Sequence, residues 1–415
     1  MKAASTSASQ RIFFSVGEPS GDVHGANLIR VLRQRAPQLE VRGMGGPRMA
    51  AAGMELLTDL TQLAVMGLAQ VVTKIPTFWR LYRRVCDDLD RHPPAAVVLI
   101  DFPGFNWWVA RAAKRRGIPV FYYGVPQLWA WGRWRLAKMK RLVDHVLCKL
   151  PFEAQWYRQQ GLQAQYVGHP YFDELLTRRL DAAFVRAQQD SDGPLVTLLP
   201  GSRRQEVRFN LPGLLKSACE IRKRIPRARF AVAAFNEEQA AMVQAALKEQ
   251  RESVPIEVHV GRTAELIAAA EACIACSGSV SLELLYHLRP SVIVYRTRRS
   301  AWFLLRWLLL KVRYITLVNL LACEDRFETS KGPYDPQTSD LERVPFPEYA
   351  GYWDCSFQVA QHVVQWLQDP ARKAACVALL EPLRSELAKA GASARAAEYI
   401  LAHVQGKQQV TPAAA

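Results

Sequence analysis

A strand that ends on an aspartate has the clearest chemical potential in this sequence. The wholly apolar run Ala96–Ile100 stops at Asp101, and Phe102-Pro103-Gly104 follows. An ionised aspartate at the end of a buried strand can take the proton of a hydroxyl nucleophile. The alternative is that Asp101 caps the helix that follows, but Asn106 is better placed to serve the start of that helix. We therefore expect Asp101 to be a general base.

A turn of small and acidic residues follows the first apolar run, Arg11–Val16. Glycines such as Gly21 let the backbone approach a ligand closely, and the N-terminus of the helix expected next offers N–H groups to an anion. The pattern is neither G-x-G-x-x-G nor a P-loop, which argues against a dinucleotide or ATP. A structural turn capped by Ser20 or Asp22 is an equally good interpretation. The turn reads Gly17-Glu18-Pro19-Ser20-Gly21-Asp22.

Two turns in the second half of the sequence suit a diphosphate. After the apolar run Leu195–Leu199 comes Pro200-Gly201-Ser202-Arg203, and the guanidinium of Arg203 can bind a diphosphate with several donors. After Ala272–Ala275 comes Ser277-Gly278-Ser279, and the carboxylate of Glu283, one turn into the next helix, can accept hydrogen bonds from ribose hydroxyls. The alternatives are a surface charge for Arg203 and helix caps for the serines.

An aromatic segment follows the apolar run Val120–Tyr123. It contains Gln127, Trp129 and Trp131, and aromatic faces are good surfaces for sugars or acyl chains. Tryptophans that pack in the core are an equally good interpretation of this segment.

The elements that must position these residues alternate between short apolar runs and helical patterns. Nearly continuous apolar runs are typical of parallel strands covered by helices on both faces. The pattern breaks near residues 190–194 and then resumes. We expect an α/β fold of two doubly wound, Rossmann-like domains with a cleft between them, and ligands at the carboxyl ends of the strands. The expected segments are an acceptor-side domain over 11–190, a nucleotide-binding domain over 191–348, and C-terminal helices over 349–405 that pack back towards the first domain.

Composition limits the function classes. The 415 residues carry 54 basic and 38 acidic side chains, a net charge of +16, which attracts anions. The basic residues are dispersed and match no nucleic-acid-binding motif, so we expect no nucleic-acid partner.

Cys273 and Cys276 form a C-x-x-C, but no second pair or nearby histidine completes a zinc site, and buried thiols are the better interpretation. The first residues lack the apolar stretch of a signal peptide, and a cytoplasmic location is expected.

Ten short motifs, in order from about Arg11 to Leu321, resemble the lipid-A-disaccharide synthase family. The resemblance implies a glycosyltransferase of the B fold type that joins UDP-2,3-diacylglucosamine to the 6-hydroxyl of 2,3-diacylglucosamine 1-phosphate. It implies release of UDP, inversion through one displacement, a place in lipid A biosynthesis, and neither cofactor nor metal. The motifs are VGEPSGDVHGANLIRVL, GMGGPRM, LAVMGL, IDFPGFN, QLWAW, LPFE, VGHP, LPGSRRQEV, SGSVSLELL and VNLLA.

The resemblance also implies roles for individual residues. It makes Asp101 the base on the acceptor hydroxyl, and it assigns catalytic roles to Glu18 and Asn319. The residues expected to bind substrates are Ser20, Gly21, Asp22, Met66, Gln127, Trp129, Arg203, Glu206, Ser277, Gly278, Ser279 and Glu283.

The sequence departs from the family pattern at four places, one of which is SGSVSLE, a looser match than SGTATLE. Gly104 replaces a second acidic residue, Val318 stands where proline is usual, and the family pattern is lost after Cys323, which leaves a role for Glu328 open. Another glycosyltransferase of the same fold or a UDP-sugar epimerase is the nearest alternative function. A non-catalytic lipid-binding protein is a more distant one.

Two segments have the make-up of interfacial helices, because they mix tryptophan and leucine with arginine. They are residues 75–84 and 296–311. Substrates with acyl chains and the net positive charge favour peripheral binding to the anionic inner membrane surface. Packed core helices with exposed arginines are the alternative for both segments. The family analogy also suggests a homodimer.

Overall fold

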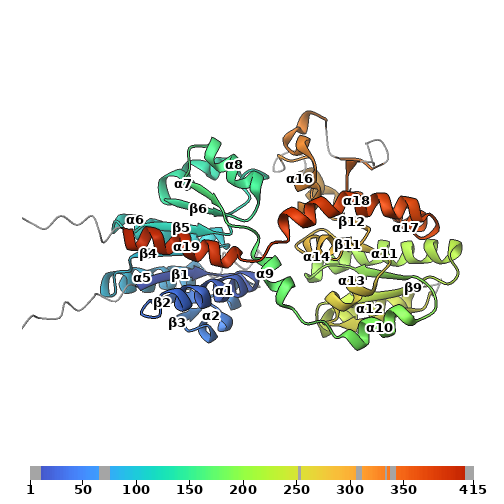
Figure 1. Cartoon of the computed structure of the whole chain (residues 1–415), viewed down its shortest axis with the longest axis horizontal. Helices are drawn as coiled ribbons and strands as arrows, with labels where there is room; N and C mark the ends of the chain where they lie inside the picture. The colour runs from blue at the N-terminus through green and yellow to red at the C-terminus, as the bar shows by residue number, and fades with distance from the viewer. Residues whose placement is uncertain are drawn as a thin grey trace, which may run out of the picture. The chain divides into compact units, whose positions relative to one another are not determined.

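The computed structural model describes residues 11–64, 75–250, 254–304, 311–331, 334–336 and 343–406. The chain forms two compact units, one of Met1–Glu174 with Lys389–Ala415 and one of Leu175–Ala388. Each unit is built around one parallel sheet with helices packed on it (Figure 1). This is the α/β fold of two doubly wound sheets that the sequence predicts.

The first unit contains a seven-stranded parallel sheet with the order β3-β2-β1-β4-β5-β6-β7. The order doubles back between β1 and β4, and such a reversal is where ligands bind in open α/β sheets. The register pairs Val16 with Ile100, so the loops after β1 and β4 begin side by side. The strands are β1 (Arg11–Val16), β2 (Glu40–Gly45), β3 (Glu55–Asp59), β4 (Ala96–Ile100), β5 (Val120–Tyr123), β6 (His145–Cys148) and β7 (Ala164–Tyr166).

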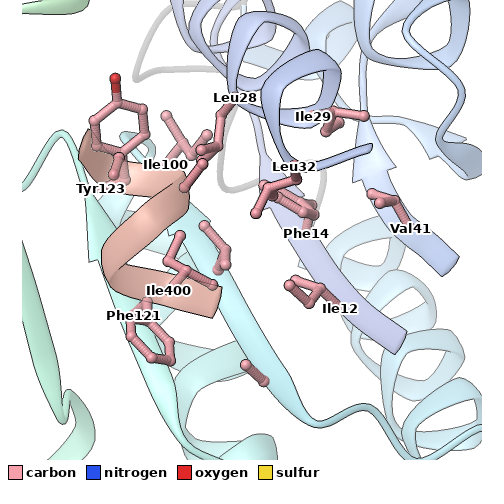
Figure 2. Close-up of a cluster of buried hydrophobic side chains, with 14 of the residues drawn as sticks. Ile12, Phe14, Leu28, Ile29, Leu32, Val41, Ile100, Phe121, Tyr123 and Ile400 are labelled. Carbon is pink, nitrogen blue, oxygen red and sulfur yellow. The ribbon is translucent and has the colours of Figure 1, made fainter. Parts of the chain in front are cut away.

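The helices of this unit bury one apolar face on the sheet. Ile400 and other apolar residues of α19 lie in the same core cluster as Phe14, Ile100 and Phe121 of the sheet (Figure 2). The C-terminal helix is therefore part of the first core. The helices are α1 (Pro19–Arg35), α2 (Pro47–Ala51), α3 (Thr61–Ala64), α5 (Ile75–Arg91), α6 (Pro103–Arg115), α7 (Leu136–Leu142), α8 (Pro151–Gln159), α9 (Pro170–Thr177) and α19 (Ala392–Gly406).

The second unit contains a six-stranded parallel sheet with the order β10-β9-β8-β11-β12-β13. Its core joins the sheet to α11 and α17. The strands are β8 (Leu195–Leu199), β9 (Arg229–Ala234), β10 (Ile256–Val260), β11 (Ala272–Cys276), β12 (Ser291–Arg296) and β13 (Glu348–Gly351). The helices are α10 (Ala182–Asp190), α11 (Arg204–Arg224), α12 (Glu237–Glu249), α13 (Thr263–Ala269), α14 (Val280–Tyr286), α15 (Arg299–Phe303), α16 (Leu317–Ala322), α17 (Ser356–Gln368) and α18 (Pro370–Leu387).

Candidate functional site

The backbone turns sharply where β4 ends. Asp101 has φ +46° and Phe102 φ +42°, a left-handed conformation that costs a non-glycine residue free energy. Two side chains hold the turn through the carbonyl oxygen of Asp101: the amide Nδ2 of Asn106 donates to it at 2.9 Å and the hydroxyl of Tyr122 at 2.7 Å. A strained turn at a strand end that other groups hold in place is typical of a functional position.

The sequence analysis expected the side chain of Asn106 to serve the start of the helix after β4, and the structure shows that it does not. Helix α6 already begins at Pro103, and Asn106 lies within its first turn. Its side chain is fully buried and joins the ends of two strands. Nδ2 also donates to the carbonyl oxygens of Ser15 and Ile100, each at 3.2 Å. Oδ1 accepts a hydrogen bond from the Ser15 hydroxyl at 2.7 Å. Asn106 thus ties β1 to β4 at the turn that carries Asp101.

Glycines from two other loops surround the Asp101 turn. A Cβ on Gly17 would lie 2.3 Å from the ring of Phe102, and one on Gly21 would lie 3.5 Å from Oδ2 of Asp101. A Cβ on Gly124, whose φ is +67°, would lie 3.2 Å from Oδ1 of Asp101. The small residues after β1 and β5 thus let the backbone approach the carboxylate, as the sequence suggested for the first of these loops.

Lys149, which directly follows β6 and which the sequence analysis did not single out, is a cation beside this carboxylate. Its Nζ lies 3.5 Å from Oδ1 of Asp101, and the two side chains are 20% and 19% exposed. Burial lowers the pKa of Lys149, but Asp101, Glu153 and Glu18 outweigh burial, and the pKa of the ammonium lies above its ordinary value. Lys149 is therefore charged at neutral pH. In the sequence, the one indication of a role for Lys149 was a charged residue directly after the mostly apolar strand β6.

The other residues predicted in the loop after β1 occupy different surroundings. Glu18 is half-buried at the position just before α1, and Ser20 is exposed. Asp22 is buried and its carboxylate accepts hydrogen bonds from the backbone N–H groups of Gly46, Arg48 and Met49, each at 3.0 Å. Asp22, in the first turn of α1, thus caps α2 and joins the start of α1 to the loop after β2.

The aromatic segment after β5 divides into a buried and an exposed part. Trp129 is fully buried, donates from Nε1 to Glu153 at 3.0 Å and packs edge-on against Phe152. This is the core position that the alternative interpretation expected. Gln127 and Trp131 are exposed, and the guanidinium carbon of Arg135 lies 4.2 Å from the centre of the Trp131 ring. Met66 lies outside the described residues.

The turn after β8 in the second unit is organised by a carboxylate. Oε2 of Glu206 accepts hydrogen bonds from the backbone N–H groups of Ser202 and Arg203 at 3.0 and 3.1 Å. Gly201 has φ +124°, and a Cβ there would lie 2.6 Å from the Cβ of Glu206, so only glycine fits. The side chain of Arg203 is 79% exposed and reaches back to Glu206 at 3.3 Å. A guanidinium is thus available at the start of α11.

Two amide side chains that the sequence analysis missed hold the same turn. Asn210 is buried and donates to the carbonyl of Pro200 at 3.2 Å. Gln239, at the start of α12, donates to the carbonyl of Ser202 at 2.7 Å and accepts from the N–H of Phe235 at 3.2 Å. Asn210 comes from α11, the helix that follows the turn directly, whereas Gln239 comes from α12, which only the tertiary fold brings to the turn.

The second predicted turn lies beside the first, because β11 pairs with β8. The space around Gly278 is open, and Ser279 is exposed. The Ser277 hydroxyl donates to the carbonyl of Ile315 at 3.3 Å. Glu283 is almost fully buried and forms an ion pair of 2.7 Å with Arg178, a residue that the sequence analysis did not single out.

Asn319 lies in a buried network with Glu348 and Phe346. Its Nδ2 donates to the carbonyl of Phe346 at 2.7 Å and to Oε2 of Glu348 at 3.1 Å, and its Oδ1 accepts from the N–H of Phe346 at 3.1 Å. Glu348 also accepts from the backbone N–H groups of Ile315 and Thr316. These bonds support a structural role for Asn319, in joining α16 to β13.

This network predicts a pH dependence of stability. Burial raises the pKa of Glu348 from 4.5 to about 7, although its hydrogen bonds act in the opposite direction. The folded state therefore holds the proton more tightly than the unfolded state, and Glu348 should cost stability progressively as pH rises from 4.5 to 7. Between these pH values the free energy of unfolding of the wild type should fall by about 3 kcal/mol because of Glu348, and Glu348→Gln should abolish that fall. Urea unfolding at several pH values measures it.

The exposed Glu381, on α18 of the same unit, provides the matched control. Glu381→Gln should leave the pH profile of the unfolding free energy as in the wild type. Parallel profiles for Glu348→Gln and wild type would show that Glu348 does not titrate with a raised pKa.

The described part of the chain contains neither a cluster of metal ligands nor a membrane-spanning helix. Within the described ranges, no three histidine, cysteine or acidic side chains gather closely enough to hold a metal ion. Cys273 and Cys276 are buried free thiols, and burial raises the pKa of each to about 12. Among the described helices, none is long and apolar enough to cross a membrane.

Comparison with known proteins identifies relatives over nearly the whole chain. The family model for lipid-A-disaccharide synthetase (LpxB) matches residues 12–338. The lipid-A-disaccharide synthase of Myxococcus xanthus is 34% identical over 395 residues, which cover 94% of this chain and 97% of the relative. That of Trichlorobacter lovleyi is 34% identical over 403 residues, which cover 95% of this chain and 98% of the relative.

Solved structures share the fold at low sequence identity. A putative UDP-N-acetylglucosamine 2-epimerase from Listeria monocytogenes has a TM-score of 0.62 at 12% identity and covers 96% of this chain and 98% of its own. The calicheamicin glycosyltransferase CalG4 has a TM-score of 0.54 at 14% identity, with coverage of 97% and 99%. Both are similar in fold to this chain.

Proposed function

The chain belongs to the lipid-A-disaccharide synthase family and is a glycosyltransferase, and from this premise we propose the reaction that it catalyses. It transfers 2,3-diacylglucosamine from UDP-2,3-diacylglucosamine to the 6-hydroxyl of 2,3-diacylglucosamine 1-phosphate and releases UDP. The observation that carries the acceptor half of this proposal is the strained turn that presents Asp101 beside Lys149. The family membership carries the choice of substrates.

Asp101 acts on the acceptor in this proposal. Its carboxylate takes the proton of the 6-hydroxyl while that oxygen attacks the anomeric carbon of the donor. One new carbon–oxygen bond forms as the bond to the UDP oxygen breaks, so the configuration inverts and no sugar–enzyme bond is made. Glu18 lies in the adjacent loop, and its negative charge is close enough to contribute to the raised pKa of Lys149. We therefore place Glu18 on the acceptor side of the site.

The second unit binds the nucleotide in this proposal. The exposed guanidinium of Arg203 and the N–H groups at the start of α11 bind the diphosphate and stabilise the charge that develops on UDP. Glu206 keeps this turn in shape through its two backbone hydrogen bonds. The open turn Ser277–Ser279 gives a second set of backbone donors, next to Glu283 on α14.

The test is a product assay with both substrates and with each one omitted. We expect UDP and the β-1,6-linked disaccharide to appear in equal amounts and only when both substrates are present. UDP release without dependence on the acceptor would contradict the transferase. Interconversion of UDP-sugar epimers in place of disaccharide formation would contradict it as well.

Peripheral association with the inner membrane completes the proposal. On α5, Ile75 and Trp79 are 59% and 51% exposed, and Trp79 lies edge-on to the 49%-exposed Trp108 of α6. Arginines on the same helix are exposed beside them, namely Arg80, Arg83 and Arg84. An apolar surface among basic residues suits the boundary of an anionic bilayer. In the second unit, Phe303 and Leu304 are exposed near the start of the other predicted segment, whose residues 305–310 lie outside the described ranges.

A flotation assay checks the membrane proposal. Wild-type protein should float with vesicles that contain anionic lipid at low salt, and Trp79→Ser combined with Trp108→Ser should weaken flotation by roughly tenfold, because both changes remove apolar area from the contact. Trp134→Ser, at an exposed tryptophan outside α5 and α6, is the matched control. Absence of wild-type flotation at low salt would refute the proposal.

The homodimer and the cytoplasmic location remain parts of the same proposal. The homodimer comes from the family analogy, whereas the free cysteines scattered through the described chain fit a reducing cytoplasm. Sedimentation in detergent at several protein concentrations tests the dimer, and a single monomeric species throughout would contradict it.

A further inference from the structure

Lys149 has no part in the chemistry described so far, although it forms the ion pair with the proposed base. We infer that Lys149 is a positioning residue that holds the carboxylate of Asp101 in the orientation needed for proton transfer. The inference rests on the proposed function, in which Asp101 is the base. Three features of the structure carry it.

The first feature is the anchoring of Lys149 itself. Its backbone N–H donates to Oε2 of Glu153 at 3.0 Å, and Oε1 of Glu153 accepts from Trp129. Both Glu153 and Trp129 are buried, so the start of α8 is rigidly attached to the core. The lysine side chain therefore extends from a fixed backbone and meets Asp101 at 3.5 Å.

The second feature is the space that Gly124 leaves for this pair. A Cβ on Gly124 would lie 3.2 Å from Oδ1 of Asp101 and 3.3 Å from Nζ of Lys149. Any side chain at position 124 would press against both ends of the ion pair. The loop after β5 is therefore shaped to let the carboxylate and the ammonium meet.

The third feature is the balance of positive and negative charges around Asp101 and Lys149. Titratable and charged groups from every neighbouring element face Asp101 and Lys149. They are Glu18 just before α1, His24 from α1, Tyr122 and Tyr123 from β5 with Arg135 near Tyr122, Glu153 from α8, and His169 before α9. Burial, and then Lys149, lowers the pKa of His24 to about 3, and the same causes lower the pKa of His169. Both histidines are thus neutral near pH 7, and Lys149 is the cation that offsets the carboxylates of Glu18 and Asp101.

Replacing Lys149 by methionine keeps the length of the side chain and removes the charge. Asp101 would then lie near Glu18 without this cation, and its carboxylate would lose the partner that orients it. We expect the acid limb of the kcat/KM profile to move up by about one pH unit and kcat to fall about tenfold or more. Lys149→Arg should restore most of kcat and return the acid limb towards the wild-type position.

Lys140→Met, an exposed lysine on α7, is the matched control and should leave both readouts as in the wild type. Equal losses of kcat in Lys149→Met and Lys149→Arg with an unmoved acid limb would overturn the inference, since they would indicate a purely structural role. So would wild-type kinetics in Lys149→Met.

A second readout separates this inference from the proposed function. The 13C carboxyl resonance of Asp101, assigned by its loss in Asp101→Asn, reports the surroundings of that group without turnover. If wild-type protein forms no disaccharide, the proposed function fails, yet a displaced Asp101 resonance in Lys149→Met, with Lys140→Met unchanged, still supports the ion pair. An Asp101 resonance that stays in place in Lys149→Met contradicts the inference even in an active enzyme.

Discussion

Asp101→Asn should lower kcat by about 10²-fold or more while the protein stays folded. Asparagine has nearly the same shape and tolerates the left-handed conformation at φ +46° better than most residues. The carbonyl of residue 101 can still accept from Asn106 and Tyr122, so the turn should survive. What disappears is the carboxylate that takes the proton. Steady-state kinetics under saturating substrates measure the loss.

Two further measurements sharpen this result. UDP binding should match the wild type, because the change does not touch the turn at Arg203, and Tm should fall somewhat, because Lys149 loses its ion-pair partner. The acid limb of the pH profile should disappear in the residual activity. Turnover within a few fold of the wild type would remove Asp101 from the role of base, and Glu18, in the adjacent loop, would become the carboxylate to test.

Asp22→Ala should destabilise the protein by about 3 kcal/mol, because three backbone N–H groups lose a charged acceptor. These are the groups of Gly46, Arg48 and Met49 at the start of α2. For a unit of this size we expect Tm to fall by roughly 5–10 °C. Thermal unfolding followed by circular dichroism measures the change.

Asp22→Asn should have an intermediate effect, because one carbonyl oxygen remains to accept. The exposed Asp87, on α5 of the same unit, is the control, and Asp87→Ala should leave Tm nearly unchanged. If Asp22→Ala keeps its Tm but raises KM for the acceptor, Asp22 binds substrate, as the family resemblance implies, and its hydrogen bonds to α2 contribute little to stability.

Much of the fold is legible in the sequence. The runs Arg11–Val16, Ala96–Ile100, Val120–Tyr123 and Leu195–Leu199 are strands with the expected bounds. They are almost wholly buried and mostly apolar, as expected for central parallel strands covered by helices on both faces. Strands β2, β3 and β13 are harder to recognise in the sequence, because they lie at or next to sheet edges and carry glycine or charged residues. Their propensity is weak, and pairing with a neighbouring strand makes them strands.

The functional site, like the fold, could be predicted only in part from the sequence. The sequence by itself determined that a carboxylate ends β4 and that glycine-containing turns follow β1, β8 and β11, because strand ends and glycine turns are local patterns. Only the tertiary structure decided which groups surround them. Lys149 reaches Asp101, Asp22 caps α2, and Gln239 holds the turn at Ser202, all across distances in sequence that no local pattern records. Hydrogen bonds and ion pairs depend on positions within a few tenths of an ångström, and packing of the helices on each sheet sets those positions.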